Sequence, residues 1–140
     1  MRYIKKKLII DKVKIEDIAK KFDTPTYCYS YTQLKKNVGN FKKSFRSFSP
    51  LICFAIKSNT NANIIREIQK FGLGADVVSM GELMMALKAG INPKKIVFSG
   101  VGKKSNEISY AIDKKILLIN AESKSEINEI DRLARIKKKK

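Results

Sequence analysis

Apolar residues recur along this chain in two rhythms, one with the spacing of a helix and one with the alternation of a strand. Residues 7–11 alternate as a short strand, and residues 15–22 follow with the spacing of an amphipathic helix. Residues 26–30 combine aromatic and hydroxyl side chains, which favours a second strand. Helical spacing returns over residues 32–48 and should end at Ser49, because a residue that precedes a proline resists helical geometry.

From residue 51 onward the two rhythms alternate regularly. Strands are predicted at residues 51–57, 75–78, 95–99 and 116–120. Each is followed by a predicted helix, at residues 63–71, 79–90, 105–114 and 123–133. Consecutive strand–helix units with short connections predict an α/β fold, in which helices cover a parallel sheet. A closed α/β barrel has about eight such units, so these four would form half of one.

The strand predicted at residues 51–57 is apolar on both faces and ends at Lys57. Alternation places Phe54 on one side and both Ala55 and Lys57 on the other. A strand of this kind is normally buried on both faces, and ligand sites of α/β folds gather at its carboxyl end. A lysine shielded from water loses proton affinity, and its neutral amine can form a Schiff base with a carbonyl. The alternative is a lysine that ends a strand and points into water, since buried lysines are rare.

The high positive charge of the chain, taken alone, suggests a nucleic-acid-binding protein. The 30 Lys and Arg exceed the 13 Asp and Glu, which gives a net charge of +17. A basic nucleic-acid-binding module is therefore an alternative. The basic residues are spread along the whole chain, without interleaved aromatic residues of a ribonucleoprotein motif and without an arginine-rich helix face. This distribution favours a diffuse basic surface with no specific nucleic-acid partner.

Composition also indicates the cellular compartment and excludes some kinds of metal and catalytic site. No apolar run approaches the ~18 residues of a membrane span, and the amino terminus makes a poor secretory signal. We therefore expect a cytoplasmic protein with no membrane partner. The chain has two cysteines, Cys28 and Cys53, and no histidine, which excludes a Cys/His zinc site and a catalytic Cys–His pair. We expect no metal, and we expect both thiols to be reduced and buried.

Three blocks of sequence carry a resemblance to a known family. Residues 54–59 (Phe-Ala-Ile-Lys-Ser-Asn) resemble the Tyr-x-Val-Lys-x-Asn signature of pyridoxal-phosphate-dependent decarboxylases of the alanine-racemase-like barrel type. Residues 74–83 (Gly-Ala-Asp-Val-Val-Ser-Met-Gly-Glu-Leu) resemble the second block of that family, and residues 96–103 resemble its third. The blocks follow in the family's order. The resemblance runs from about residue 7 to about residue 134 and points to the diaminopimelate decarboxylase branch.

The resemblance implies a fold and a set of site residues. The fold would be the amino-terminal half of a (β/α)8 barrel that binds pyridoxal 5′-phosphate, preceded by a short strand-helix-strand-helix segment. Lys57 would be catalytic and would hold the cofactor as an aldimine. Asp76 would bind the cofactor near that lysine, and the small Ala55 would leave room for its ring. A structural carboxylate at Asp76 and a packing role for Ala55 are the alternatives. Glu82 matches a family acid near the active site, but we favour a helix cap, because Ser79 and Glu82 form the S-x-x-E pattern.

The resemblance also implies an activity, which is decarboxylation of meso-diaminopimelate to lysine. Later blocks of the family do not occur in these 140 residues. They include the histidine that stacks on the ring, the phosphate loop, and the glutamate that pairs with the pyridine nitrogen. We therefore expect a truncated and inactive fragment. Residues 1–31 would join a second domain, residues 32–136 would form a partial barrel, and residues 137–140 would be a basic tail. For the full-length family we expect an amino-acid substrate and a homodimer.

Two other pyridoxal-phosphate proteins are alternatives within this resemblance. One is a sister decarboxylase that acts on ornithine, arginine or carboxynorspermidine. The other is a non-catalytic pyridoxal-phosphate carrier, a single barrel without a second domain. The carrier is disfavoured because residues 7–30 resemble the segment that joins the second domain of the decarboxylases.

Overall fold

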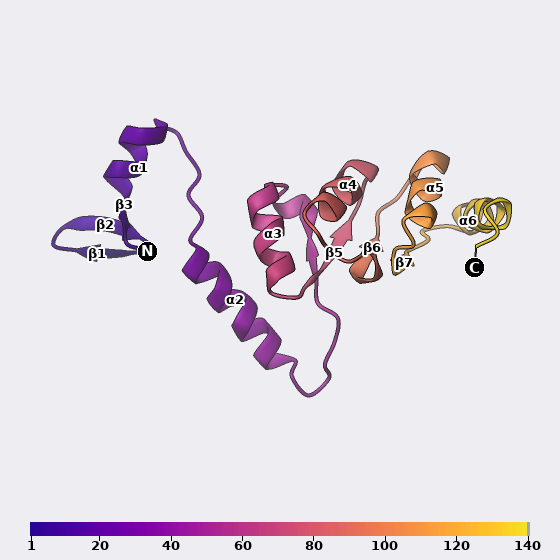
Figure 1. The fold of residues 1–140 in the computed structure, drawn as a ribbon, viewed down its shortest axis with the longest axis horizontal. Coiled ribbons are helices and arrows are strands. Elements are labelled where there is room, and N and C mark those ends of the chain that lie inside the picture. Colours follow the sequence, from indigo (N-terminus) through magenta and orange to yellow (C-terminus); the bar gives the residue numbers. More distant parts are fainter. Residues whose placement is uncertain (140) are drawn as a thin grey trace. The chain divides into compact units, whose positions relative to one another are not determined.

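The computed structural model describes residues 1–139 and contains two compact units, Met1–Ser49 and the chain from Pro50 onward (Figure 1). The first unit begins with an antiparallel sheet in the order β1-β2-β3. Its elements are β1 (Arg2–Ile4), β2 (Lys7–Ile10), β3 (Val13–Lys14), α1 (Ile15–Phe22) and α2 (Tyr31–Ser44). The strand predicted at residues 7–11 and the helix predicted at residues 15–22 are confirmed as β2 and α1.

Two strands of the first unit, β1 and β3, were not predicted. Each joins β2 through a tight turn, at residues 5–6 and 11–12, in which both central residues have positive φ angles. This is the geometry that matches the twist of a hairpin, although lysine is an unusual residue there. Asp11 also accepts hydrogen bonds from the Ser30 hydroxyl (2.8 Å) and the Thr32 N–H (3.0 Å). The bond from the Thr32 N–H is the main cause that lowers the pKa of the Asp11 carboxyl.

The strand predicted at residues 26–30 is not formed, so the predicted strand-helix-strand-helix order of the first unit is wrong. These residues belong to no strand, and Tyr27 is 91% exposed. Alternation and β-propensity describe a segment able to pair, but a strand also needs a neighbouring strand, which the described residues do not supply here. Cys28 is consequently exposed and not buried as expected. Helix α2 ends at Ser44, and the predicted end of this helix at residue 48 falls in a turn.

The second unit alternates strands and helices along the chain (Figure 1). Its elements are β4 (Cys53–Ala55), α3 (Ala62–Lys70), β5 (Gly74–Val77), α4 (Met80–Lys88), β6 (Ile96–Phe98), α5 (Ser105–Asp113), β7 (Leu118–Ile119) and α6 (Lys124–Ile136). The four strands are parallel and lie in chain order, β4-β5-β6-β7. The predicted α/β class with a four-stranded parallel sheet is therefore confirmed.

One face of this sheet carries the hydrophobic core. Ala75, Val77, Ile96 and Phe98 are fully buried among residues of the helices, such as Ile65, Leu83, Ala86 and Ala111. Side chains alternate along a strand, so the intervening positions lie on the opposite face. That face, which we call the open face, carries the paired positions Ala55, Asp76, Val97 and Leu118. These four are half-buried or exposed, because the described residues place no helix over them.

Strand β4 is shorter than predicted and stops two residues before Lys57. Residues Ile56–Ser58 form a 3-10 turn, which the Asn59 N–H closes by donating to the Ile56 carbonyl (2.9 Å). The Ser58 hydroxyl donates to the Ala55 carbonyl at 2.7 Å and stabilises the same turn. Ile56, in the turn, is fully buried in the core. Across residues 1–139, no helix is both long enough and apolar enough to cross a membrane.

Candidate functional site

The carboxyl ends of the four parallel strands place polar residues along one edge of the open face. Lys57 follows β4, Asp76 lies in β5, Ser99 follows β6 and Asn120 follows β7. The register pairs Ala55 with Asp76 and Asp76 with Val97, and Ser99 lies two residues beyond Val97. The Ser99 N–H extends the ladder by donating to the Val77 carbonyl (2.8 Å), which keeps Ser99 in strand geometry. This edge is where α/β folds place their ligand sites.

Lys57 is exposed and lies in the turn after β4, so within the described residues it points into water, which was one of the two alternatives that the sequence left open. The reason is the early end of β4, since the turn directs the chain away from the sheet at Ile56. The turn itself is anchored, because Ile56 is fully buried. Lys57 therefore presents a flexible amine on a fixed backbone, open to solvent on the same edge as the other polar residues.

The carboxylate of Asp76 has a hydroxyl partner and no ion-pair partner among the described residues. The Ser99 hydroxyl donates to Asp76 Oδ1 at 2.6 Å, and the Asn120 amide donates to the Ser99 oxygen at 3.1 Å. Asp76 and Lys57 form no ion pair with each other within residues 1–139. Burial, and then the negative charge of Asp76, raise the pKa of the Cys53 thiol, which lies on the open face in β4. The negative charge of Asp76 thus affects a side chain on the neighbouring strand.

Small residues let β5 lie close to both of its neighbouring strands below this polar edge. A side chain at Gly74 would collide with the backbone carbonyl of Lys95 and lie 2.9 Å from the Cys53 sulfur. Cys53 pairs with Gly74 in the register, and Ala55 pairs with Asp76 two residues later. Ala55 is half-buried and contributes only a methyl group to the open face. On the β4 side, the open face next to Asp76 therefore carries only small side chains.

Glu82 stabilises the start of α4, as the S-x-x-E pattern predicted. The Glu82 N–H donates to the Ser79 hydroxyl at 3.2 Å, and the Glu82 carboxylate accepts from the Val78 N–H at 2.9 Å. Ser123 and Glu126 repeat this arrangement at the start of α6. Both carboxylates therefore cap helices, although each reaches one residue further back than in the standard capping box.

A second lysine near the strand ends was not predicted as part of the site. The side chain of Lys103 is 1% exposed and forms an ion pair with Glu126 (3.2 Å). Its amine also donates to the carbonyls of Gly100 and Asn120, both at 2.6 Å. Burial raises the pKa of the Glu126 carboxyl, but the Glu122 N–H and Lys103 outweigh it and lower that pKa overall. Lys103 therefore fixes the backbone just after β6 and β7.

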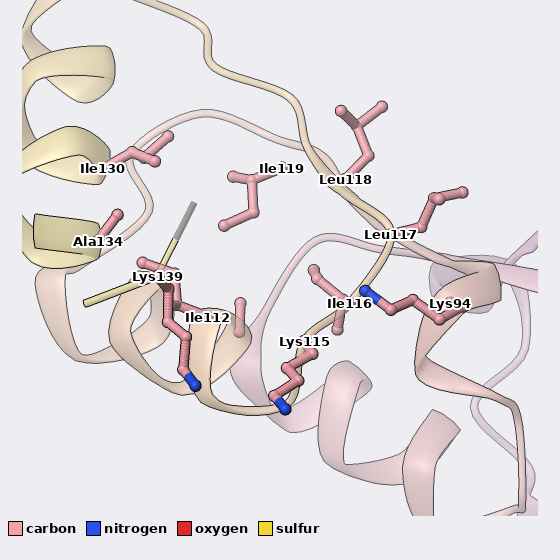
Figure 2. Close-up of a pocket in the computed structure, with 11 residues that line it drawn as sticks. Lys94, Ile112, Lys115, Ile116, Leu117, Leu118, Ile119, Ile130, Ala134 and Lys139 are labelled. Atoms are coloured by element: carbon pink, nitrogen blue, oxygen red, sulfur yellow. The ribbon is translucent and has the colours of Figure 1, made fainter. Parts of the chain in front are cut away.

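A groove of about 370 Å³ lies beside β7, apart from the predicted site residues (Figure 2). Figure 2 shows apolar side chains around it, with lysine side chains beside them. Its lining consists of Lys94, Ala111, Ile112, Lys115, Ile116, Leu117, Leu118, Ile119, Ile130, Ala134 and Lys139. Apart from its three lysines, the described lining of this groove is apolar, so the groove is a surface for apolar contacts.

Comparison with known families tests the resemblance that the three sequence blocks indicated. Residues 31–138 match the model of the pyridoxal-dependent decarboxylase family, pyridoxal-binding domain. The chain belongs to this family. Its curated relatives include diaminopimelate decarboxylase from Aquifex aeolicus, 39% identical over 134 residues, which are 96% of this chain and 31% of that protein. The enzyme of the same name from Helicobacter pylori (strain J99) is 44% identical over 119 residues, 85% of this chain and 29% of that protein.

Solved structures of pyridoxal-dependent decarboxylases show the same fold. A crystal structure from Aquifex aeolicus matches with a TM-score of 0.95 and 39% identity over 99% of this chain and 34% of that one. Diaminopimelate decarboxylase from Helicobacter pylori, complexed with L-lysine, matches with a TM-score of 0.85 and 40% identity. That match covers 89% of this chain and 32% of that one. The four-stranded sheet and its helices thus correspond to the amino-terminal part of the decarboxylase barrel.

Identity differs between the members of the family that the chain matches. The diaminopimelate decarboxylases reach about 40% identity. An ornithine decarboxylase from Entamoeba histolytica is 28% identical, with a TM-score of 0.64. The chain spans about a third of the length of the relatives that it matches, 31% and 29% of the two curated proteins above.

Proposed function

We propose that this chain is the cofactor-holding part of a cytoplasmic diaminopimelate decarboxylase, acting on meso-diaminopimelate to give lysine. Lys57 binds pyridoxal 5′-phosphate covalently through its amine, and Asp76 and Ala55 lie against the cofactor. The observation that carries this proposal is the position of Lys57. It stands at the carboxyl end of a strand in a pyridoxal-binding domain, within the sequence block that resembles the family's cofactor lysine.

The residues at this edge fit an aldehyde-bearing, planar cofactor. Lys57 offers an accessible amine, which an aldehyde needs, on a turn that is held by Ile56. Ala55 leaves flat space beside it on the open face, and Asp76 supplies a negative charge that favours a positively charged nitrogen nearby. When bound, pyridoxal phosphate withdraws the electrons that remain after loss of carbon dioxide.

Each residue of the chain has a distinct task in this proposal. Lys57 would hold the cofactor through its amine, which could also donate or accept a proton when it is free. Asp76 would stabilise positive charge near that amine, and its Ser99 partner keeps the carboxylate oriented. The exposure of Lys57 means that water is not yet excluded from the reacting nitrogen in this unit. Charge interactions of this kind become strong only where water is excluded. We therefore infer that this chain alone does not decarboxylate.

The remaining assignments of the whole protein rest on the same family membership. We propose that the full-length protein is a homodimer with a small amino-acid substrate. The division into residues 1–31, 32–136 and 137–140 stays a prediction, and Lys140 lies outside the described residues. Lys137, the first residue of that tail, caps α6 and forms an ion pair with Asp113 (2.7 Å).

Borohydride trapping tests the role of Lys57. The chain is mixed with pyridoxal phosphate, reduced, digested and mapped by mass spectrometry. We expect the pyridoxyl label at Lys57 well above the level at other exposed lysines, and a specific loss of this label in Lys57→Ala. Lys88→Ala, which removes an exposed lysine of α4, serves as the matched control and should leave the label at Lys57 unchanged. Equal labelling of many exposed lysines would contradict the proposal.

A further inference from the structure

Three side chains from three neighbouring strands form a hydrogen-bonded line across the open face. Asp76 lies in β5, Ser99 directly follows β6, and Asn120 directly follows β7. The Ser99 oxygen lies 2.6 Å from Asp76 Oδ1 and 3.1 Å from the Asn120 amide nitrogen. The line ends at the strand next to β4, which leads to Lys57.

The chemistry of the three groups sets the direction of the line. A carboxylate only accepts hydrogen bonds, and the amide nitrogen of asparagine only donates them. The Ser99 hydroxyl has one proton, so it accepts from Asn120 and gives its proton to Asp76. A hydroxyl that already accepts a hydrogen bond is a stronger donor to the next group, since such chains polarise one another. The bond to the charged carboxylate is accordingly short, at 2.6 Å.

The far end of the line is held by a buried lysine. The Lys103 amine donates to the backbone carbonyl of Asn120 at 2.6 Å, and the Asn120 N–H donates to the Phe98 carbonyl at 2.9 Å. Both backbone groups of Asn120 are thus bound, which fixes the backbone from which its side chain reaches Ser99. At the near end, Asp76 Oδ2 has no hydrogen-bond partner among the described residues, so only one carboxylate oxygen is restrained.

We propose that Ser99 and Asn120 are positioning residues, which hold one oxygen of Asp76 so that the other faces the amine of Lys57 at the cofactor site. This inference rests on the function proposed above, and it assigns to the strand ends of β6 and β7 a task beyond packing. Ser99 sets the orientation of the carboxylate directly. Asn120 acts through Ser99, so its effect is smaller and in the same direction.

The test measures how far Lys57 is labelled by pyridoxal phosphate and borohydride at a fixed, limiting cofactor concentration. Ser99→Ala should lower the labelled fraction roughly threefold to tenfold, the range expected when contacting residues act together. Ser99→Thr, which keeps the hydroxyl, should restore most of it. Ser109→Ala, which removes a similarly half-buried hydroxyl on α5, should have no effect.

A double-mutant cycle separates positioning from general loss of structure. In an Asp76→Asn background, Ser99→Ala should cause no further loss, because the charged group that it orients is gone. An equal loss in both backgrounds, or no loss in Ser99→Ala, would overturn the inference. If circular dichroism shows that Ser99→Ala is unfolded, Asn120→Ala replaces it in the same double-mutant cycle with Asp76→Asn. A wild-type chain without label at Lys57 would instead refute the proposed function, and the inference with it.

Discussion

Four acceptors surround the amine of Lys103, and no local pattern in the sequence indicates any of them. Its partners are the carbonyls of Gly100 and Asn120 and the two oxygens of Glu126. Gly100 to Lys103 lie in the loop after β6, and Glu126 caps the start of α6. The loop and the cap share one ion pair, which no sequence pattern predicts. That contact depends on tertiary structure, since 23 residues separate the two side chains.

The Lys103–Glu126 pair makes the stability of the second unit dependent on pH. The folded state lowers the pKa of Glu126 below its ordinary value of 4.5. The stabilisation is therefore present above about pH 4.5 and is lost as the pH falls through the folded-state value. Glu126→Gln leaves the Lys103 charge buried without a counter-charge, and we expect it to cost about 3 kcal/mol at neutral pH.

Urea unfolding at pH 7 and pH 4, followed by circular dichroism, measures both effects. Glu126→Gln should weaken the fall in stability between the two pH values. Part of that fall should remain, because the Lys104 and Met80 N–H groups lower the pKa of Glu107 as well. Glu122→Gln removes an exposed neighbouring carboxylate and serves as the control. An unchanged pH dependence in Glu126→Gln would show that the pair contributes little.

At the scale of elements, the close approach of β5 to the strands on both of its sides depends on a residue without a side chain. Gly74→Ala places a methyl group against the Lys95 backbone carbonyl and the Cys53 sulfur, so the strands must move apart. We expect a loss of about 2–4 kcal/mol in unfolding free energy, in the range of severe overpacking. Gly81→Ala is the matched control, since its added carbon would lie 3.8 Å from the Ser79 hydroxyl oxygen, which is an ordinary contact distance. A small loss in Gly74→Ala would mean that the sheet adapts.

The elements themselves were predictable to different degrees, for physical reasons. The βα units from residue 51 onward follow from local periodicity, because each element buries its own apolar face. The segment at residues 26–30 failed because strand formation depends on a partner, and β4 proved short because the hydrogen bonds of residues 55–59 favour a turn. Lys57, Asp76 and Ala55 were predicted as site residues from two sequence blocks. Ser99 and Asn120 were not, since only the sheet brings them to Asp76.

At the scale of the whole second unit, the sheet ends at two strands that each have one neighbour. Strands β4 and β7 are the outer strands, and each pairs on one side alone within the described residues. Leu117 and Leu118 are 48% and 49% exposed beside the groove at β7. An unpaired strand edge next to apolar surface is prone to further pairing or association. The net charge of +17 opposes such contact, and salt weakens that opposition.

We therefore expect the purified chain to associate as its concentration and the salt concentration rise. Leu118→Lys adds a charge at the groove and should shift the distribution towards monomers in analytical ultracentrifugation. Val101→Lys adds the same charge at a residue that is 83% exposed in the loop after β6, away from this groove, and should change little. Equal effects of both variants would indicate that total charge, and not the β7 edge, controls association.

The burial of Lys103 also gives the chain an internal chemical reporter. Amine-acylating reagents modify lysines that solvent can reach, and most lysines of this chain lie on its surface. The Lys103 side chain is 1% exposed and its amine is occupied by four acceptors, so it resists modification while the second unit is folded. Protection of this one peptide in a mass spectrum then measures native structure directly. It can do so in a crude mixture, without any cofactor or substrate.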